Sequence, residues 1–388
     1  MVSRRLLSNI ALRVLENTVG QANPANNVCL YGPTLDANLL VMKDFIIDNE
    51  LNIKFNFKIL YFTSKNVNIN IDKNQIPINS IKGLWNYIRH CKIFLATNNI
   101  FAKDRYPIHN RKSLMIQLWH GLPIKSRPKQ TTSFNLDSFD IFLSTSSFSS
   151  YLLASYMDVP VEKFKVTGYP RNDKLLRPNA RIAAREILYK YLKIKNNFSK
   201  YIIYMPTFRR YNFKVHINIA SSKIVKTAIK NNYFLVIKYH IVDEMSYKKE
   251  IEYIKDKLNR YNNVFVLRTP ELASMGLTIY DLLPAFDILI TDYSSISNDF
   301  LLLDKPIIFY TPDLDQYYDN EGLIYPKRSL PDIFPGPILI SDGDFNEDLV
   351  ESDNYTDNRR RMRNLLHEYT DDKSSYRLWK IIEDYLQQ

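Results

Sequence analysis

Short apolar runs alternate with longer stretches of helical periodicity along most of the chain. In its first part, the runs that indicate strands are NVCLYG (27–32), FKILYFT (57–63), KIFLAT (92–97), SLMIQLW (113–119), DIFLST (140–145) and KVTG (165–168). Helix-like segments lie between them, and one of these, SFSSYLLASYMD, follows Ser and Thr residues that can cap a helix. This alternation predicts a parallel sheet covered by helices on both faces.

A second series of the same kind begins near residue 201. Its predicted strands are YIIYMPT (201–207), FLVIKYH (234–240), NVFVLRT (263–269), DILITDY (287–293) and KPIIFYT (305–311). The helix-like segment RPNARIAAREILYKYLKIKNNFSK separates the two series. We therefore predict an α/β fold with two Rossmann-like lobes that face a central cleft, residues 1–178 and 179–388, with the basic helical C-terminus packing back across the lobes.

The composition of the chain fits two folded lobes and excludes disorder. Its 388 residues exceed the usual size of one domain, and 45% of them are hydrophobic. With 52 Lys and Arg against 41 Asp and Glu, the net charge is +11. This surplus favours an anionic partner, and phosphorylated substrates, anionic lipid surfaces and nucleic acid are the candidates.

Two features of the sequence bear on the compartment. Cys29 and Cys91 both lie in apolar surroundings and are too few for a disulfide framework or a zinc cluster, which predicts a reducing compartment, the cytoplasm. No run approaches the roughly 18 apolar residues that span a bilayer, and Arg13, Glu16 and Asn17 interrupt the N-terminal segment. We expect that segment to form a helix packed on the domain, with a basic amphipathic helix at a membrane surface as the alternative.

Polar residues gather where the predicted strands end, which is where doubly wound folds bind their ligands. These candidates are His120, Gly121 and Lys125 after the first such strand, Gly168, Tyr169, Arg171, Asn172 and Asp173 after the second, Thr207, Arg209 and Arg210 after the third, His240 after the fourth, and Asp292, Ser294 and Ser295 after the fifth, with Asp299 about one turn inside the helix that follows. Since five strand ends share this feature, we expect the residues to line the cleft.

Each of these histidines and serines can be interpreted as a functional residue or as a structural one. Histidine exchanges a proton near neutral pH, so His120 and His240 are candidate bases or phosphate-stabilising groups, or else structural residues. Ser294 and Ser295 begin a predicted helix whose unpaired N–H groups can bind a phosphate, although either hydroxyl would also serve as a simple cap.

The arginines point to phosphate, whereas metal motifs are absent from the sequence. Arg171 and Arg209 carry guanidinium forks that match phosphate oxygens, and the alternative for each is a solvated surface charge. No His or Cys spacing matches a zinc site, the acidic stretch 313–321 lacks the glycine of a calcium loop, and neither GxGxxG nor a Walker motif is present. We therefore expect no metal site and no tightly bound cofactor.

In order and spacing, these motifs resemble those of one known family. They are WHGLPIK (119–125), GYPRND (168–173), MPTFRR (205–210), the strand-end His240, TDYSSISNDF (291–300) with KPIIFYTPDLDQY (305–317), and PGP (335–337). Over roughly residues 85–345 the set is similar to that of the CDP-glycerol glycerophosphotransferases, which are teichoic acid primases and polymerases and their capsule-polymer relatives. Phe208, Arg210 and Ile241 depart from the residues that the family often carries at those positions.

The resemblance implies a glycosyltransferase-B-like fold and transfer of glycerol phosphate from CDP-glycerol to an acceptor hydroxyl, with CMP leaving. His120 would be the base in the acceptor-side lobe, and His240 would stabilise the diphosphate from the donor-side lobe. The remaining candidates would bind the donor (Gly168, Arg171, Asn172, Pro206, Thr207, Arg209, Asp292, Ser294, Ser295 and Asp299) or the acceptor and phosphate (Gly121 and Lys125).

The implied acceptor is a lipid-linked glycan or a polyol-phosphate chain, in teichoic acid or capsule-type polymer synthesis. The resemblance also implies a peripheral enzyme on the cytoplasmic face of a bacterial membrane, where anionic lipids would attract the basic chain. Its length is closer to that of a primase, which adds one unit.

Three alternatives stay open for the function: a transferase that uses CDP-ribitol as its donor, a nucleotide-sugar glycosyltransferase of the same fold, and a non-catalytic protein that binds nucleic acid or membranes. The last is disfavoured, and no nucleic acid is expected, because Lys and Arg are spread over both lobes.

Overall fold

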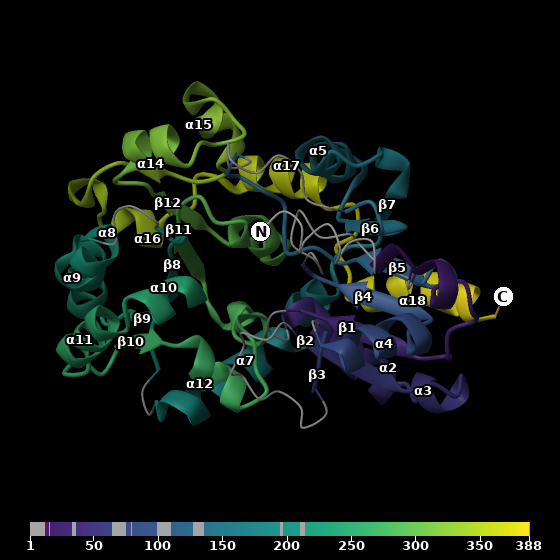
Figure 1. Ribbon diagram of the computed structural model, residues 1–388. Coiled ribbons are helices and arrows are strands. Elements are labelled where there is room, and N and C mark those ends of the chain that lie inside the picture. The colour runs from purple at the N-terminus through teal and green to yellow at the C-terminus, as the bar shows by residue number, and fades with distance from the viewer. Residues whose placement is uncertain are drawn as a thin grey trace, which may run out of the picture. The chain divides into compact units, whose positions relative to one another are not determined.

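The computed structural model describes residues 12–14, 16–32, 36–63, 75–78, 80–98, 110–126, 136–194, 197–209 and 214–387. The chain divides into two compact units, and each holds one sheet (Figure 1). The first comprises Met1–His120, Lys129–Lys174 and His367–Gln388, and the second comprises Gly121–Pro128 and Leu175–Leu366. The predicted division at residue 178 differs from this one in three segments, since 121–128 and 175–178 lie in the second unit and 367–388 lies in the first.

The first sheet has seven parallel strands in the order β3-β2-β1-β4-β5-β6-β7. Their bounds are β1 (Val28–Tyr31), β2 (Ile59–Thr63), β3 (Gln75–Pro77), β4 (Ile93–Ala96), β5 (Leu114–Gln117), β6 (Ile141–Ser144) and β7 (Phe164–Val166). This is the Rossmann order, in which the strand order reverses between β1 and β4. Ligands are expected at the carboxyl ends of the strands beside that reversal.

Several helices connect or follow the strands of the first unit. They are α2 (Ala37–Asp48), α3 (Leu51–Lys54), α4 (Ile81–His90), α5 (Ser147–Met157) and α18 (Ser374–Leu386), with the 3₁₀ helices η1 (Val161–Lys163) and η2 (Pro170–Asn172); α6 (Asp173–Leu176) leads into the second unit. Asp36, Ser80 and Ser146 cap α2, α4 and α5 with their side chains.

The C-terminal helix α18 belongs to the first unit, although its sequence position suggested the second. The Asp173 carboxylate accepts hydrogen bonds from the N–H groups of Ser374 and Ser375 (2.8 and 2.9 Å) and so caps this helix. Trp379 then packs on Phe57, with ring centroids 6.1 Å apart. A cap supplied from about 200 residues away left no local signal in the sequence.

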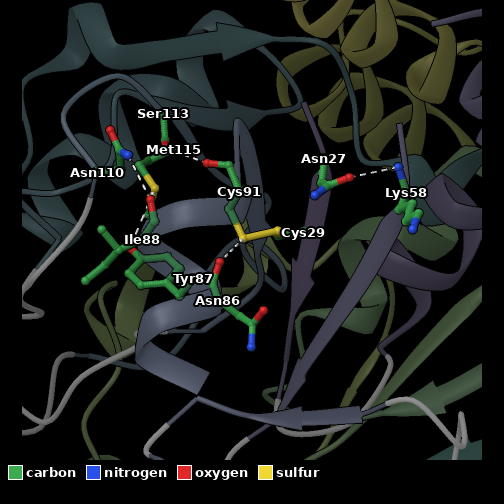
Figure 2. The surroundings of a disulfide bond; sticks show 10 residues. All are labelled: Asn27, Cys29, Lys58, Asn86, Tyr87, Ile88, Cys91, Asn110, Ser113 and Met115. Carbon is green, nitrogen blue, oxygen red and sulfur yellow. Dashed lines mark hydrogen bonds between the residues drawn. A yellow bond between two sulfur atoms is a disulfide. The ribbon is translucent and has the colours of Figure 1, made fainter. Parts of the chain in front are cut away.

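Cys29 of β1 and Cys91, which precedes β4, are joined by a disulfide (Figure 2). The prediction that two cysteines make no disulfide framework is therefore wrong for this pair, and cysteine content no longer supports a reducing compartment. The two residues are 62 apart in sequence, but β1 and β4 are neighbours in the sheet, which brings their Cα atoms to 5.6 Å. The bridge lies at the amino ends of these strands, opposite the edge where the candidate residues gather.

The second sheet repeats the same topology with six parallel strands in the order β10-β9-β8-β11-β12-β13. Their bounds are β8 (Tyr201–Met205), β9 (Phe234–Lys238), β10 (Val264–Leu267), β11 (Ile288–Thr291), β12 (Ile307–Tyr310) and β13 (Ile338–Leu339). Here the strand order reverses between β8 and β11. The predicted α/β fold of two Rossmann-like lobes is confirmed.

Helices cover the second sheet, and side chains from both layers form its core. The α-helices are α7 (Ala180–Leu192), α8 (Lys214–Ile217), α9 (Lys223–Lys230), α10 (Ile241–Ser246), α11 (Lys248–Leu258), α12 (Thr269–Ser274), α13 (Ile296–Phe300), α14 (Leu314–Asn320), α15 (Leu330–Ile333), α16 (Asp348–Glu351) and α17 (Thr356–Leu366). The 3₁₀ helices are η3 (Asn218–Ser221), η4 (Ile279–Asp281), η5 (Leu283–Ala285), η6 (Leu301–Leu303), η7 (Lys327–Ser329) and η8 (Asp342–Asp344). Among the residues described in the two units, no helix combines the length and the apolar character needed to cross a bilayer.

Candidate active site

His120 stands just beyond the carboxyl end of β5 in the first unit, with its side chain exposed. The chain turns there through two unusual residues, because Trp119 has a φ of 56° and Gly121 a φ of 131°. The His120 ring stacks on the buried Trp119 ring, with centroids 4.2 Å apart. The sharp turn therefore presents the imidazole at the edge of the sheet, beside the end of β4.

The surroundings of His120 define which ring nitrogen carries the proton. Its Nδ1 lies 3.3 Å from the carbonyl oxygen of Thr97, the residue after β4. A carbonyl oxygen can only accept a hydrogen bond, so this contact requires the proton on Nδ1. The neutral ring then keeps a lone pair on Nε2, which is the form that a general base needs.

The GYPRND segment lies at the same edge of the first unit. Gly168 has a φ of 77°, and a Cβ atom there would lie 2.5 Å from the Ser374 hydroxyl, so the turn requires glycine. Arg171 and Asn172 are both buried, and the Arg171 guanidinium lies over the Tyr169 ring, 4.8 Å from its centroid. The structure thus brings Gly168, Arg171 and Asn172 together in the first unit, whereas the other predicted donor ligands lie in the second.

Arg209 occupies the end of β8 in the second unit and is engaged by its own neighbours. Its Nε donates to Asp313 (2.7 Å), its Nη2 to Asp292 (2.7 Å) and its Nη1 to the carbonyl of Thr207 (2.8 Å). Burial alone would lower the pKa of Arg209, but the two aspartates raise it above its ordinary value. The guanidinium fork that the sequence seemed to offer to phosphate therefore neutralises two buried carboxylates.

Asp292 and Asp299 likewise hold this edge of the second unit together. Asp292 accepts hydrogen bonds from the N–H groups of Thr207 (2.8 Å) and Tyr293 (2.6 Å). Burial would raise the pKa of Asp292, and Arg209 outweighs that effect and lowers it. Asp299 is buried and accepts from the hydroxyl of Tyr280 at 2.5 Å. Asp292 thus joins the end of β11 to the segment after β8, and Asp299 joins α13 to η4.

Ser294 and Ser295 follow Asp292, where β11 gives way to α13. Both are half-buried, and the Ser294 hydroxyl accepts from the N–H of Ile296 at 3.4 Å. The helix they begin is only five residues long before it tightens into η6. Ser295 is the N-cap residue of α13 but its side chain makes no capping bond, so the plainer interpretation is met only by the Ser294 hydroxyl, through the N–H of Ile296. Both serines lie at the reversal of the strand order between β8 and β11.

His240 stands beyond the end of β9 and is the N-cap residue of α10, with its side chain exposed. Its Nδ1 accepts a hydrogen bond from the N–H of Val242 at 3.2 Å. A backbone N–H can only donate, so Nδ1 is unprotonated and the neutral ring carries its proton on Nε2. His240 thus presents a donor, the opposite of what His120 presents.

A buried ion pair that we did not predict holds α10 in place behind His240. Lys238 donates to Glu244 of α10 (2.6 Å) and to the carbonyl of Tyr239 (2.5 Å). Glu244 also accepts from the N–H of Thr269, the first residue of α12, at 2.9 Å.

Gly121, Lys125 and Pro206 complete the predicted set, all in the second unit. Lys125 is half-buried and forms an antiparallel β-bridge with Leu323. Lys125 also interacts electrostatically with Asp243 of α10. Burial raises the pKa of Asp243 to about 7, whereas the positive charges of Arg209 and Lys125 lower this pKa. In the described part of the chain, no three His, Cys, Asp or Glu side chains are grouped as metal ligands would be.

The two parallel, Rossmann-like sheets define an α/β fold of the glycosyltransferase-B kind. Residues 29–384 match the model of the family described as CDP-Glycerol:Poly(glycerophosphate) glycerophosphotransferase. This match covers most of the chain, and the chain therefore belongs to that family. The predicted family is confirmed, and with it the class of enzyme, a glycerophosphotransferase.

Curated relatives and solved structures agree with this assignment. The chain is 28% identical to a teichoic acid poly(glycerol phosphate) polymerase of Bacillus spizizenii, over 77% of this chain and 75% of the relative. It is 27% identical to a teichoic acid glycerol-phosphate primase of Bacillus subtilis (82% and 80%) and 26% identical to a teichoic acid ribitol-phosphate primase of Bacillus spizizenii (77% and 79%). A structure of the wall teichoic acid polymerase TagF, soaked with CDPG, matches with a TM-score of 0.74 at 20% identity, over 99% of this chain and 96% of that one. At this identity the structural match shows the fold alone.

Proposed function

We propose that this protein transfers glycerol phosphate from CDP-glycerol to a hydroxyl of a lipid-linked glycan or polyol-phosphate chain and releases CMP. The observation that carries the proposal is the pair of exposed strand-end histidines, which offer an Nε2 lone pair at His120 and an Nε2–H at His240. Phosphoryl transfer to an alcohol needs one acceptor and one donor of this kind.

In the proposed reaction, His120 acts on the acceptor. Its Nε2 takes the proton of the attacking hydroxyl as that oxygen forms a bond to the phosphorus of the glycerol phosphate group. The bond from this phosphorus to the oxygen of CMP breaks, and the product is a phosphodiester. A positioned base of this type contributes about 100-fold to 10,000-fold in rate.

His240 acts on the donor in the same proposal. Its Nε2–H donates to the diphosphate and stabilises the negative charge that grows on departing CMP, as fixed donors do in other transfer reactions. Ser294 and Ser295 hold the donor phosphates, and Lys125 adds a positive charge. Arg209, Asp292 and Asp299 shape this part of the second unit through the contacts described above. Gly168, Arg171 and Asn172 remain predicted donor ligands.

The proposed reaction uses no resident cofactor. Proton transfer, hydrogen bonding and positive charge are supplied by histidine, serine and lysine side chains. We expect turnover to persist after exhaustive treatment with EDTA. A loss that added Mg²⁺ or Mn²⁺ restores would show that a divalent ion assists the diphosphate.

We further propose that the protein works as a peripheral enzyme on the cytoplasmic face of the membrane. Helix α4 supports this, because Trp85 is 49% exposed and the Arg89 guanidinium lies over its ring, 6.0 Å from the centroid. An exposed Trp beside Lys82 and Arg89 fits an anionic lipid surface. Binding to anionic but not to neutral vesicles, weakened by Trp85→Ser, is the expected result; equal binding to both would contradict it.

The donor is tested by measuring release of CMP or UDP from CDP-glycerol, CDP-ribitol and a UDP-sugar, each with and without a lipid-linked acceptor. Acceptor-dependent turnover of CDP-glycerol alone is the expected result. Turnover of CDP-ribitol alone would keep the chemistry and change the donor, an outcome that the similarity to a ribitol-phosphate primase makes worth measuring. Turnover of the UDP-sugar alone would reject the proposal.

A further inference from the structure

Asn38 lies at the start of α2, beside the reversal of the strand order in the first sheet, and is fully buried. Asp36 caps this helix by accepting from the N–H groups of Asn38 (2.9 Å) and Leu39 (3.2 Å). The backbone at Asn38 is thereby fixed, and its side chain is left to reach other segments of the unit.

The Asn38 carboxamide joins two of the loops that carry candidate residues. Its Nδ2 donates to the carbonyl of Trp119 at 2.9 Å, and its Oδ1 accepts from the N–H of Arg171 at 3.1 Å. Both contacts are buried, and they span 81 and 133 residues of sequence. One side chain thus holds the loop of His120 against the GYPRND loop.

The hydrogen bond from Asn38 reaches Trp119 at a residue whose backbone conformation is unfavourable. A φ of 56° places Trp119 in the left-handed region, which costs a residue other than glycine roughly 1–2 kcal/mol. Gln117 accepts from the N–H of Trp119 at 3.0 Å, and Asn38 donates to its carbonyl. Both backbone polar groups of Trp119, its N–H and its carbonyl, therefore have hydrogen-bond partners. His120 is the next residue in the chain.

We propose that Asn38 is a positioning residue that orients His120 by fixing the carbonyl of Trp119. This inference rests on the proposed role of His120 as the base. The position needs a donor and an acceptor on one short, planar side chain, and only asparagine combines them at this length. Aspartate keeps the acceptor for Arg171 and loses the donor to Trp119, and leucine of similar size loses both.

Asn110 offers a matched control in the same unit. It is also a buried asparagine, and its Nδ2 donates to the carbonyl of Ile88 at 2.8 Å (Figure 2). The same Nδ2 donates to the carbonyl of Ala22 (3.0 Å), and its Oδ1 accepts from the N–H of Lys112 (2.9 Å). It precedes β5, whereas Trp119 and His120 follow that strand. Asn110→Asp and Asn110→Leu therefore remove the same kinds of hydrogen bond at the opposite end of β5.

The test compares kcat and the KM for CDP-glycerol in the four variants, at temperatures where each is folded by circular dichroism. We expect Asn38→Asp and Asn38→Leu to lower kcat about 10-fold or more, since misplacing a catalytic group costs up to about 100-fold. The KM for CDP-glycerol should change less than about twofold in Asn38→Asp, which keeps the acceptor for the N–H of Arg171, and should rise in Asn38→Leu, which also releases the loop of the predicted donor ligand Arg171. The Asn110 variants should lose stability by a similar amount and keep kcat.

A ¹⁵N NMR measurement of the His120 ring supplies a readout that a purely structural role would leave unchanged. The parent should show the Nδ1–H tautomer, and the Asn38 variants should show a mixture or a shifted titration, unlike the Asn110 variants. If His120→Ala abolishes turnover while folded Asn38→Asp keeps both kcat and the His120 tautomer, the inference about Asn38 is wrong. If His120→Ala itself keeps turnover, the proposed base is wrong instead.

Discussion

His120 in the first unit and His240 in the second both stand beyond the carboxyl end of a parallel strand, yet their Nδ1 atoms have opposite partners. The Nδ1 of His120 faces the carbonyl of Thr97, and the Nδ1 of His240 accepts from the N–H of Val242. One ring therefore exposes an acceptor at Nε2 and the other a donor. Two histidines with the same sequence context can thus serve two different chemical roles, because a backbone group fixes the tautomer of each.

The two edges also differ in how they use charge. At the first edge, the Thr97 carbonyl beside Nδ1 of His120, the Trp119 ring stacked on it and the Asn38 side chain that supports the turn are all neutral groups. In the second unit, the Arg209 guanidinium forms ion pairs with Asp292 and Asp313. A charged residue that follows a strand can therefore be part of the scaffold, as Arg209 is, and the comparison between the two edges is open to direct tests.

Removing Arg209 should have the largest effect, and on stability. Arg209→Met leaves Asp292 and Asp313 buried without their counter-charge, which we expect to lower the free energy of unfolding by roughly 3–5 kcal/mol. Urea unfolding measures this. The control Arg181→Gln breaks a half-exposed pair with Asp287 and should cost about 1 kcal/mol or less. A stable Arg209→Met whose KM for CDP-glycerol rises steeply would instead make Arg209 a donor ligand.

Substitutions of the two histidines test their opposite roles. His120→Ala and His120→Gln should both lower kcat by about 100-fold or more, because neither side chain can take a proton. His240→Ala should lower kcat by a similar factor, since removing a fixed donor costs about 100-fold or more.

His240→Gln separates the two roles, because a glutamine amide can still donate a hydrogen bond. We expect it to keep at least about a tenth of the parent turnover. Steady-state release of CMP measures all four variants. Equal losses for His120→Gln and His240→Gln would remove the distinction between acceptor and donor.

The serines at the end of β11 should affect donor binding more than turnover. Replacing both Ser294 and Ser295 by Ala should raise the KM for CDP-glycerol about 10-fold, equivalent to about 1.4 kcal/mol, with kcat within about threefold. Ser222→Ala is the matched control, since Ser222 caps α9 by accepting from Val225. It should cost about 1 kcal/mol of stability and leave the KM unchanged. An unchanged KM in the double variant would mean that Ser294 and Ser295 are only caps.

Asp243 should produce a smaller effect that depends on pH. Burial raises the pKa of Asp243 to about 7 in the folded chain, so the folded state keeps this proton where the unfolded state has lost it. The stability that this group contributes is present below about pH 4 and is lost as the pH rises to about 7, by up to roughly 1.4 kcal/mol per pH unit. Asp243→Asn cannot ionise, and its unfolding free energy should fall less over this range. Parallel pH profiles for the two proteins would show that Asp243 has an ordinary pKa.

Much of the fold was predictable because the strands are short, fully buried apolar runs separated by helical periodicity. Eleven of the predicted strands are present within one or two residues of their expected ends. The strands β3 and β13 were missed, since they have only three and two residues and lie at sheet edges, where little apolar sequence is needed. The disulfide and the cap on α18 were missed because they depend on which distant segments become neighbours.

The candidate site shows the same limit. Most predicted site residues closely follow the carboxyl end of a strand, as the parallel topology dictates, whereas Asp299 lies inside α13 and Lys125 pairs with Leu323. Whether such a residue meets a ligand or a neighbour depends on contacts such as Asp313 with Arg209, which no local pattern reveals. Asn38 and Glu244 were overlooked for a related reason, since each lies inside a helix pattern and acts through a partner elsewhere in its unit.

The central claim is the transfer of an intact glycerol phosphate group, and mass spectrometry of the acceptor tests it most directly. After incubation of purified protein with CDP-glycerol and a lipid-linked acceptor, we expect the acceptor to gain one or more glycerol phosphate units, with one CMP released for each. His120→Ala should show neither product. CMP released while the acceptor keeps its mass, or an acceptor that gains glycerol without phosphate, would contradict the account.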